Sequence, residues 1–486
     1  MKLLWLKQIQ FINELIKNEN NVTADYLKNV FSRKEYKELL KNSLKVLKSN
    51  PNAFAYAYRS GLFKLNGIEN KIKNIIDDKK LAPGIVIDYG TLNNQETILY
   101  KNCQDIYENE ESSVNKTSMM SPDTLFDLAS TSKLFTAISI LQLAQLGLID
   151  LNGPVKEYTD KFPNISDVKI IDLLTFNVPI KTDKRIDEAI SFNEAEQILF
   201  TVHQYNNTKP YIYTDMGCLV LKYIIESITG VSLKRFIEDH ILWPCGMNRT
   251  FLNVPNSLLS NVANENYASY VDDNGKIVTL TNIYPGFVHD AKANALNHQL
   301  GNASGHAGWF SCANDMSKLA RGLLTNVLLK EEFLLMLGQS GQIDNPLIGE
   351  ETPQWKSHHG ILTFTKQPNP NFLKVQPFLS GKAFISPGFA GTTFCLDPLN
   401  KIYCFSAGNR LHNRIYKIPD KYKDNIQELE TGQRIYDDGN TQKTISITYA
   451  KESQEIVKSV MELALQMRLI EKTVSEKKQM KLVREL

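Results

Sequence analysis

Four serines in this chain stand three residues before a lysine, a spacing that can pair a nucleophile with a proton-handling cation. They are Ser113, Ser130, Ser166 and Ser475. Positions i and i+3 share a helix face, so the lysine reaches the hydroxyl where the segment is helical. Ser130 alone opens a long apolar run, which predicts a helix over residues 131–146. Ser130 is therefore the candidate nucleophile, with Lys133 as its partner.

The start of the predicted helix suits acyl chemistry. Its free N–H groups and positive dipole end would favour the oxyanion that forms when Ser130 attacks a carbonyl. In the alternative interpretation, Ser130 only caps the helix and Lys133 is a surface lysine. The tetrapeptide alone does not decide between the two.

A second segment favours the catalytic interpretation. Tyr213-Thr214-Asp215 precedes an apolar run of helical spacing over residues 217–230. Together with the Ser130 segment it resembles the serine β-lactamase and penicillin-binding-protein superfamily, most of all the class C-like branch with its esterases and D-amino-acid peptidases. The resemblance implies that Ser130 is acylated, that Lys133 accepts a proton and that Tyr213 is the second acid/base.

Further segments resemble motifs of the superfamily and follow its order. They are GLIDL at 147–151, PCGMNRT at 244–250, VHD at 288–290, GHAGWFS at 305–311 and NRLH at 409–412. The likeness begins near Gly67 and leaves out residues 1–62. It implies an α/β (α+β) fold in which an antiparallel sheet is flanked by helices and carries an inserted all-helical lobe.

The third motif of the superfamily, Lys-Thr-Gly or His-Thr-Gly on the strand that lines the site, is altered. Ser386-Pro387-Gly388 stands in its place. Proline belongs on an edge strand, and Gly388 would let a substrate approach closely. The resemblance implies that the N–H groups of Phe389 and Ser130 form the oxyanion hole, which does not need the lost side chains. The missing cation and hydroxyl argue against efficient turnover of penicillins or D-alanyl-D-alanine ends.

Two other departures concern the surroundings of Lys133. Asp215 replaces the commoner asparagine, and an ionised Asp215 would raise the pKa of Lys133, which gives Tyr213 more of the base role. Phe176-Asn177-Val178-Pro179 stands where the family often has His-Thr-Ser-Gly, so we expect a remodelled loop over the site.

Three residues, His289, Asp290 and His306, invite a metal site or a Ser–His–Asp triad. The superfamily needs neither, and no cysteine pair has zinc-like spacing. We therefore expect structural histidines, no metal and no cofactor. His358-His359 reads as a surface pair.

The elements that position these residues come from both ends of the chain. Strands are predicted at 85–89, 96–101, 383–385, 392–396 and 402–406, with helices between them and a polar loop at 417–444. One antiparallel sheet is then built from both ends. The predicted domains are a helical extension at 1–62 and a β-lactamase-like domain at 63–486. In that domain the sheet lobe takes 63–129 and 300–486, and the helical lobe about 130–299.

Composition narrows the functional classes. Hydrophobic residues are 42% and charged residues 22% of the chain, and the net charge is +2, so nothing favours nucleic acid or an anionic membrane. Residues 1–18 lack the run of about 7–15 apolar residues of a secretory signal. No stretch approaches the ~20 apolar residues of a membrane span. We expect a cytoplasmic protein.

The sequence thus predicts a metal-independent serine hydrolase or acyltransferase, an esterase or peptidase rather than an efficient β-lactamase. It would act on a small-molecule or peptide acyl substrate. The catalytic residues would be Ser130, Lys133 and Tyr213, and the oxyanion or substrate would contact Phe389, Gly388, Asp215 and Ser386. The alternative is a non-catalytic binding or scaffold protein with residues 1–62 as the surface for a protein partner. The altered third motif supports it, and the intact catalytic residues oppose it.

Overall fold

The structure is a computed structural model. It describes residues 68–79, 81–101, 120–206, 213–263, 269–279, 285–339, 359–366, 375–430, 434–445, 452–468 and 471. The predicted extension at 1–62 lies outside the described residues. The chain divides into two compact units, Met1–Lys71 with Glu462–Leu486 and Ile72–Met461. The proposed bounds of the sheet lobe and the helical lobe stay a prediction.

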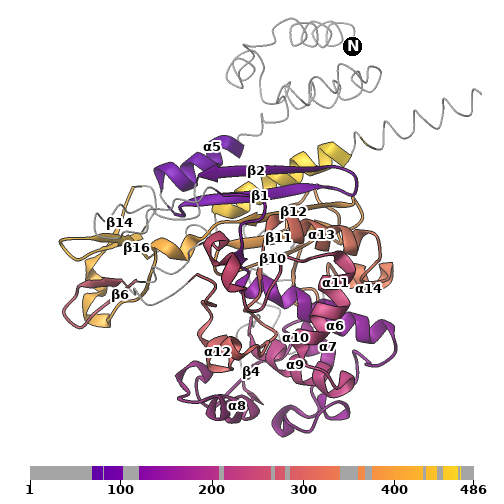
Figure 1. The fold of residues 1–486 in the computed structure, drawn as a ribbon. Coiled ribbons are helices and arrows are strands. Elements are labelled where there is room, and N and C mark those ends of the chain that lie inside the picture. The colour runs from indigo at the N-terminus through magenta and orange to yellow at the C-terminus, as the bar shows by residue number, and fades with distance from the viewer. Residues whose placement is uncertain are drawn as a thin grey trace, which may run out of the picture. The chain divides into compact units, whose positions relative to one another are not determined.

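A six-stranded antiparallel sheet forms the centre of the unit Ile72–Met461 (Figure 1). Its strand order is β2-β1-β12-β11-β10-β9, so the hairpin from the start of the unit pairs with strands from its second half. The strands are β1 (Gly84–Thr91), β2 (Gln95–Lys101), β9 (Phe364–Thr365), β10 (Phe384–Pro387), β11 (Thr392–Asp397) and β12 (Ile402–Ala407). The prediction of one sheet built from both ends is confirmed.

The middle of the sheet is buried on both faces. Every residue of β11 and β12 is buried, in keeping with their apolar and β-branched runs. β1 pairs with β12 from Val86↔Ala407 to Thr91↔Ile402. Helix α13 (Ala313–Leu324) packs on β1 and β12. The turn that follows β10 and belongs to the candidate site is therefore anchored in a buried sheet.

A lobe of helices lies beside the sheet (Figure 1). Its centre is α6, whose residues from Lys133 to Leu143 are all buried and which packs on α9 and α10. An all-round buried helix of this kind belongs in a core. The helices are α6 (Lys133–Gln145), α7 (Ile170–Leu174), α8 (Phe192–Phe200), α9 (Met216–Thr229), α10 (Leu233–Ile237), α11 (Trp243–Cys245) and α12 (Ala291–Ala295).

Further helical segments complete the described part of the chain. They are α5 (Ile68–Lys73), which continues into a π-helical turn (Asn74–Asp78), α14 (Glu331–Met336) and the helical residues 452–468. Lys79 and Glu452 form an ion pair of 2.6 Å, which ties the start of the unit to its last helix.

Two short strand pairs support the helical lobe and the approach to Ser130. β3 (Phe126–Asp127) pairs with β8 (Phe310–Ser311), and β4 (Ile180–Lys181) pairs with β5 (His203–Gln204). Through β3 and β8, the segment that leads to Ser130 lies against the GHAGWFS segment.

The prediction of a loop over 417–444 is wrong, because this region contains short strands. β13 (Ile415–Lys417) joins β6 (Ser269–Val271) and β7 (Ile277–Thr279), and β14 (Ile426–Glu428), β15 (Arg434–Asp437) and β16 (Gln442–Thr444) form another sheet. Tyr436 is buried in a cluster with Val271 and Ile415. Strands this short and this exposed show no long alternation of apolar residues, so the sequence gives little sign of them.

β10 corrects the prediction of an edge strand. β9 pairs with Phe384 and Ile385, so the edge of the sheet is β9 rather than β10. The pairing with β9 ends before Ser386, however, and Pro387 pairs with β11 only. Proline is therefore tolerated because the strand has one neighbour at that point.

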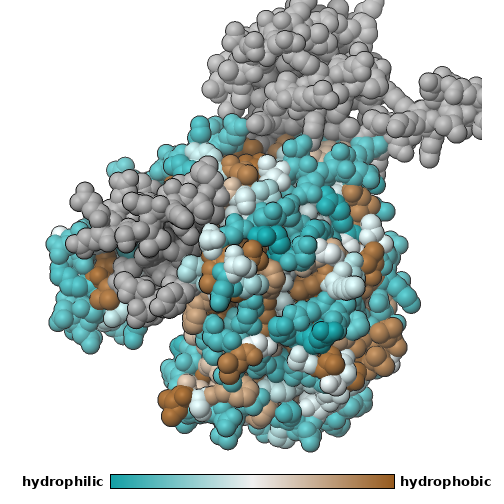
Figure 2. Space-filling view, viewed as in Figure 1, coloured by the Kyte–Doolittle hydropathy of each residue, from teal (hydrophilic) through white to brown (hydrophobic). Residues whose placement is uncertain are grey.

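Hydrophobic side chains exposed on the surface are scattered. Figure 2 shows a largely hydrophilic face with separate hydrophobic patches. Among the described residues, no single helix has the length and hydropathy to cross a membrane, although α9 and Leu233–Cys245, bent by 78°, pass that test together.

Candidate active site

Ser130 lies where a strand turns into a helix. β3 ends at Asp127, and a 3-10 turn (Ala129–Ser132) leads into α6. Ala129 has a φ of 44°, in the left-handed region that non-glycine residues seldom adopt. Ser130 is partly exposed, whereas its neighbours on both sides are buried. The strained turn thus presents the hydroxyl-bearing residue at the head of a buried helix, as functional sites often do.

The buried carboxylate of Asp127 holds this turn in place. It accepts hydrogen bonds from the N–H groups of Ala129 at 2.8 Å and His289 at 2.9 Å. Burial raises the pKa of Asp127 to about 6, although both backbone donors favour the charged form. One side chain therefore fixes the Ser130 segment relative to the segment that carries Asp290.

Lys133 is buried and points at Ser130. Its Nζ donates to Ser130 Oγ at 2.8 Å and to the His306 carbonyl oxygen at 3.3 Å. The same Nζ forms an ion pair of 2.8 Å with Asp215 Oδ1. The side chain of Lys133 is only 1% exposed, so the ammonium is held by these partners rather than by bulk water.

Asp215 lies between two lysines. Its Oδ1 faces Lys133, and its Oδ2 forms an ion pair of 3.0 Å with Lys292. Burial would raise the pKa of Asp215, but the charges of Lys133, His306 and Lys292 together outweigh it, so the pKa is held well below its usual range. Burial would lower the pKa of Lys133, yet the neighbouring groups together, Asp215 first among them, raise it above its usual value. Both groups are therefore ionised at neutral pH.

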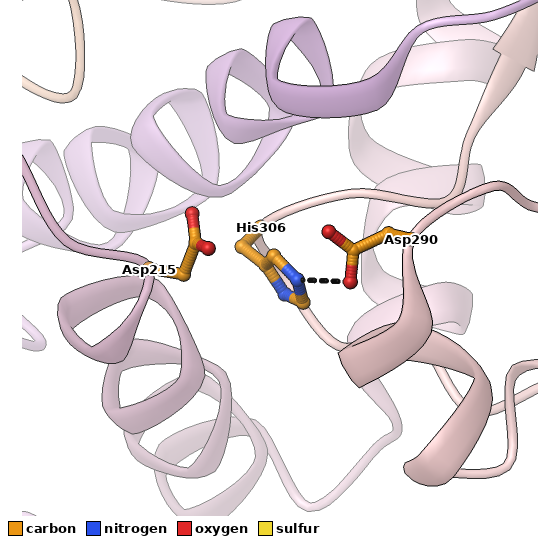
Figure 3. A group of neighbouring side chains, drawn as sticks. All are labelled: Asp215, Asp290 and His306. Atoms are coloured by element: carbon orange, nitrogen blue, oxygen red, sulfur yellow. Dashed lines mark hydrogen bonds and ion pairs between the residues drawn. The ribbon is translucent and has the colours of Figure 1, made fainter. Parts of the chain in front are cut away.

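A histidine and a second carboxylate complete the cluster (Figure 3). His306 Nε2 and Asp290 Oδ1 are 2.9 Å apart, and Asp290 Oδ2 lies 4.0 Å from Lys292. Figure 3 shows His306 between the two carboxylates of Asp215 and Asp290. The carbonyl oxygen of His306 accepts a hydrogen bond from Lys133. The contacts therefore form a ring that consists of Lys133, Asp215, Lys292, Asp290 and His306.

In the part of the chain that the structure describes, this cluster is also the group that could hold a metal ion. One ligand atom each from Asp215, Asp290 and His306 lie within 4.8 Å of one another. Both oxygens of Asp215 already face ammonium groups, those of Lys133 and Lys292. A divalent cation would meet these two like charges at close range, which opposes its binding.

Aromatic side chains form a wall beside Lys133. The Lys133 Nζ lies 5.0 Å from the ring centroid of Tyr213, which is 38% exposed. The Tyr213 ring stacks on Phe364 at 5.8 Å and lies 5.0 Å from Phe176. The predicted remodelled loop therefore contributes Phe176 to this wall. His359 contacts Phe176 and Phe364 and is buried, so its prediction as a surface residue is wrong.

The turn after β10 packs against the start of the Ser130 helix. The Gly388 N–H donates to the Thr392 carbonyl at 2.7 Å, and the Thr392 hydroxyl donates to the Leu128 carbonyl at 3.0 Å. Ala390 packs on Ala129. Phe389, in the middle of this turn, is 49% exposed. The predicted oxyanion residues thus lie on a turn that is bonded to the segment of Ser130.

Ser386 lies on the same side of the site. It is buried, and its carbonyl oxygen accepts from the Thr131 hydroxyl at 3.0 Å. The cations nearest to the turn come from beyond β12 instead. The guanidinium groups of Arg410 and Arg414 lie 4.6 and 4.8 Å from the Phe389 ring centroid, and Arg410 Nε donates to the Phe389 carbonyl.

The structure brings the predicted site residues to one place. Ser130, Lys133, Tyr213 and Asp215 are linked by direct contacts, and Ser386, Gly388 and Phe389 lie on the strand and turn beside them. Sequence reasoning missed Lys292 and Arg414. The position of Lys292 two residues after the Val-His-Asp segment was the one available signal, and its partner, Asp215, is remote in the chain.

The family of the chain follows from comparison with known proteins. A family model described as "Beta-lactamase" matches residues 93–428, well over half of the chain. The chain therefore belongs to the beta-lactamase family.

Two similar proteins, each described as "Putative D-alanyl-D-alanine carboxypeptidase", come from Salmonella. The one from Salmonella heidelberg (strain SL476) is 26% identical over 332 residues, which is 60% of this chain and 71% of the relative. The one from Salmonella enteritidis PT4 (strain P125109) is 27% identical over 324 residues, with the same coverage of 60% and 71%.

Solved structures share the fold at low identity. Simvastatin synthase from Aspergillus terreus, in its LovD6 mutant, has a TM-score of 0.55 and 15% identity over 82% of this chain and 95% of its own. A class C β-lactamase from Rhodobacter sphaeroides has a TM-score of 0.53 and 15% identity over 82% and 99%. EstCE1, a hydrolase with promiscuous acyltransferase activity, has a TM-score of 0.54 and 16% identity over 81% and 97%. Family and fold together define a serine hydrolase or acyltransferase of the β-lactamase and penicillin-binding-protein superfamily.

Proposed function

We propose that Ser130 is the acylated nucleophile and that the protein cleaves or transfers the acyl group of an ester or amide. The observation that carries this proposal is the 2.8 Å hydrogen bond from Lys133 Nζ to Ser130 Oγ at the head of a buried helix. Ser130 Oγ bonds to the substrate carbonyl carbon, the leaving group departs, and water or another acceptor then takes the acyl group.

Lys133 and Tyr213 share the proton transfers. Because Asp215 raises the pKa of Lys133, the lysine is an ammonium before substrate binds, and it stabilises the developing charge on Ser130 Oγ. Tyr213 is then the proton acceptor and returns the proton to the leaving group. General acid/base catalysis of this kind contributes about 10²–10⁴ in rate.

The N–H groups of Ser130 and Phe389 serve as the oxyanion hole in this proposal. The turn of Phe389 supports it, because Thr392 and Ala390 attach that turn to Leu128 and Ala129, directly before Ser130. Each donor of such a hole is worth about 10²–10³ in rate.

The reaction needs no metal in this proposal. Asp215, the central carboxylate of the cluster, is neutralised by Lys133 and Lys292 and has little charge left for a divalent ion. The substrate is a small-molecule or peptide acyl compound, and a neutral ester or amide is favoured over a β-lactam. Ser386, which carries no charge, stands at the position of the missing cation on β10.

Two other assignments follow from specific observations. The Salmonella relatives favour a D-alanyl-D-alanine carboxypeptidase, and the substitution at Ser386-Pro387 opposes it. The same substitution favours a non-catalytic binding or scaffold protein, and the Ser130–Lys133–Asp215 contacts oppose that assignment. A protein partner at residues 1–62 and a cytoplasmic location stay predictions.

Covalent labelling distinguishes the enzyme from the non-catalytic protein. We expect an alkyl fluorophosphonate to add once to the wild-type protein, measured by intact mass, and not to Ser130→Ala. Ser166→Ala is the matched control, because Ser166 also precedes a lysine by three residues, and it should label like wild type. EDTA should leave labelling unchanged. An unlabelled wild-type protein would support the scaffold alternative, and loss in EDTA with recovery on added zinc would refute the metal-free mechanism.

A further inference from the structure

We propose that Lys292 is a positioning residue of the active site. Its ammonium balances the second oxygen of Asp215 and so limits the pull of Asp215 on Lys133. The inference rests on the proposed function of Ser130, but it concerns a residue that touches neither Ser130 nor the reacting atoms.

The geometry assigns this role through one shared carboxylate. Lys133 Nζ lies 2.8 Å from Asp215 Oδ1, and Lys292 Nζ lies 3.0 Å from Asp215 Oδ2. The two lysines come from different elements, α6 and α12. Lys133 in turn donates to Ser130 at 2.8 Å. A change of charge at Lys292 therefore reaches the nucleophile through three direct contacts.

Lys292 itself is held in place by α12 and its cap. Asp290 caps this helix by accepting from the Ala293 N–H at 2.9 Å, and it also binds His306. Lys292 lies 4.0 Å from Asp290 Oδ2 and has 27% of its side chain exposed. The helix thus aims the lysine at Asp215 rather than into water.

The charged and titratable groups around this pair come from every neighbouring element. They are Lys133 of α6, Tyr213 before α9, Cys218 of α9, Asp290 at the cap of α12, His306 before β8, and Asp187, which acts on Lys292 and pairs with Arg185. Asp215 and Lys292 together contribute no net charge to this set. Removing either one leaves an uncompensated charge next to the base.

The sign of the effect is the same whether Lys133 or Tyr213 is the base. Lys292→Met removes a positive charge beside Asp215, and the more negative surroundings favour the protonated base. Asp215→Asn leaves Lys292 uncompensated, and the added positive charge favours the deprotonated base. The double variant restores a neutral pair. Opposite shifts that cancel in the double variant are the expected signature of charge balance, and a merely structural role would not produce them.

The experiment measures the rate constant of labelling by an alkyl fluorophosphonate between pH 6 and pH 11, a range that includes the ordinary pKa of about 10 of tyrosine and lysine side chains. The acidic limb of the profile should move up by about one pH unit or more in Lys292→Met and down by a similar amount in Asp215→Asn. It should return close to wild type in the double variant and in Lys292→Arg. Lys234→Met removes a lysine from another ion pair, with Glu238, and should not move the limb.

The outcomes separate this inference from the proposed function. If the wild-type protein does not label at Ser130, the proposed function fails. If it labels at Ser130 and Lys292→Met or Lys292→Gln keeps the wild-type limb, the role of Lys292 is wrong while the function stands. Shifts of the same sign in Lys292→Met and Asp215→Asn would also overturn it. Thermal unfolding of each variant identifies any that does not fold, and Lys292→Gln then replaces Lys292→Met.

Discussion

Gly388 should be among the positions least tolerant of a methyl group in the active site. A Cβ at this residue would overlap Thr392 Oγ1 and the Leu128 carbonyl oxygen, both inside the 3.0 Å that real Cβ atoms keep. It would also meet Thr131 Oγ1 at 3.1 Å. The Thr392 side chain can rotate at the loss of its hydrogen bond to Leu128, but the carbonyl belongs to the backbone just before Ser130. Gly388→Ala must therefore push the turn away from the Ser130 segment.

Two magnitudes follow from this displacement. Overpacking of a well-packed site costs about 1–3 kcal/mol of unfolding free energy. If the moved turn withdraws the Phe389 N–H from the oxyanion, labelling at Ser130 should fall by about 10²–10³, the effect of one lost donor. The loss of reactivity should exceed the loss of stability, because the protein remains folded while one donor is misplaced.

The assay compares two glycines near β10. Gly381 precedes the strand, and a Cβ there would meet nothing within 4 Å. Gly381→Ala should keep the wild-type rate of fluorophosphonate labelling and the wild-type melting temperature. Gly388→Ala should label more slowly and melt at a lower temperature. Labelling of a folded Gly388→Ala at the wild-type rate would refute the placement of the oxyanion hole at this turn.

Two further predictions concern substrate and pH. A neutral acyl ester should be turned over faster than nitrocefin, because Ser386 supplies no cation for the carboxylate of nitrocefin. Faster turnover of nitrocefin would contradict this prediction and make Arg414, beside Phe389, the candidate cation. The pKa of Asp127 in the folded protein is about 6, above the value of about 3.9 in the unfolded chain. Folding therefore takes up a proton between these two pH values. The contribution of Asp127 to stability accordingly grows as the pH falls from 6 to 4. Asp127→Asn should abolish that slope, so the unfolding free energy of the wild type relative to the variant should rise as the pH falls from 7 to 4.5. Denaturant unfolding of both proteins at pH 4.5, 5.5 and 7 measures the difference, and a difference that does not vary with pH would contradict the assignment.

The sequence by itself determined the elements whose signals are local. Ser130 and Lys133 are three residues apart, so their hydrogen bond needs only the helix that the apolar run predicts. The sheet strands at both ends of the chain were visible as β-rich runs between turns, and the helical segments between them already indicated one sheet built from both ends. The short strands over 417–444 had too little alternation to be seen.

The tertiary structure decided the contacts between residues that are remote in the chain. Asp215 and Lys292 are 77 positions apart, and no local pattern indicates that both lysines share one carboxylate. The burial of His359 depends on packing against Phe176 and Phe364, which come from separate segments. A sequence records which charges are present, but their protonation depends on burial and on distances that only the folded chain sets.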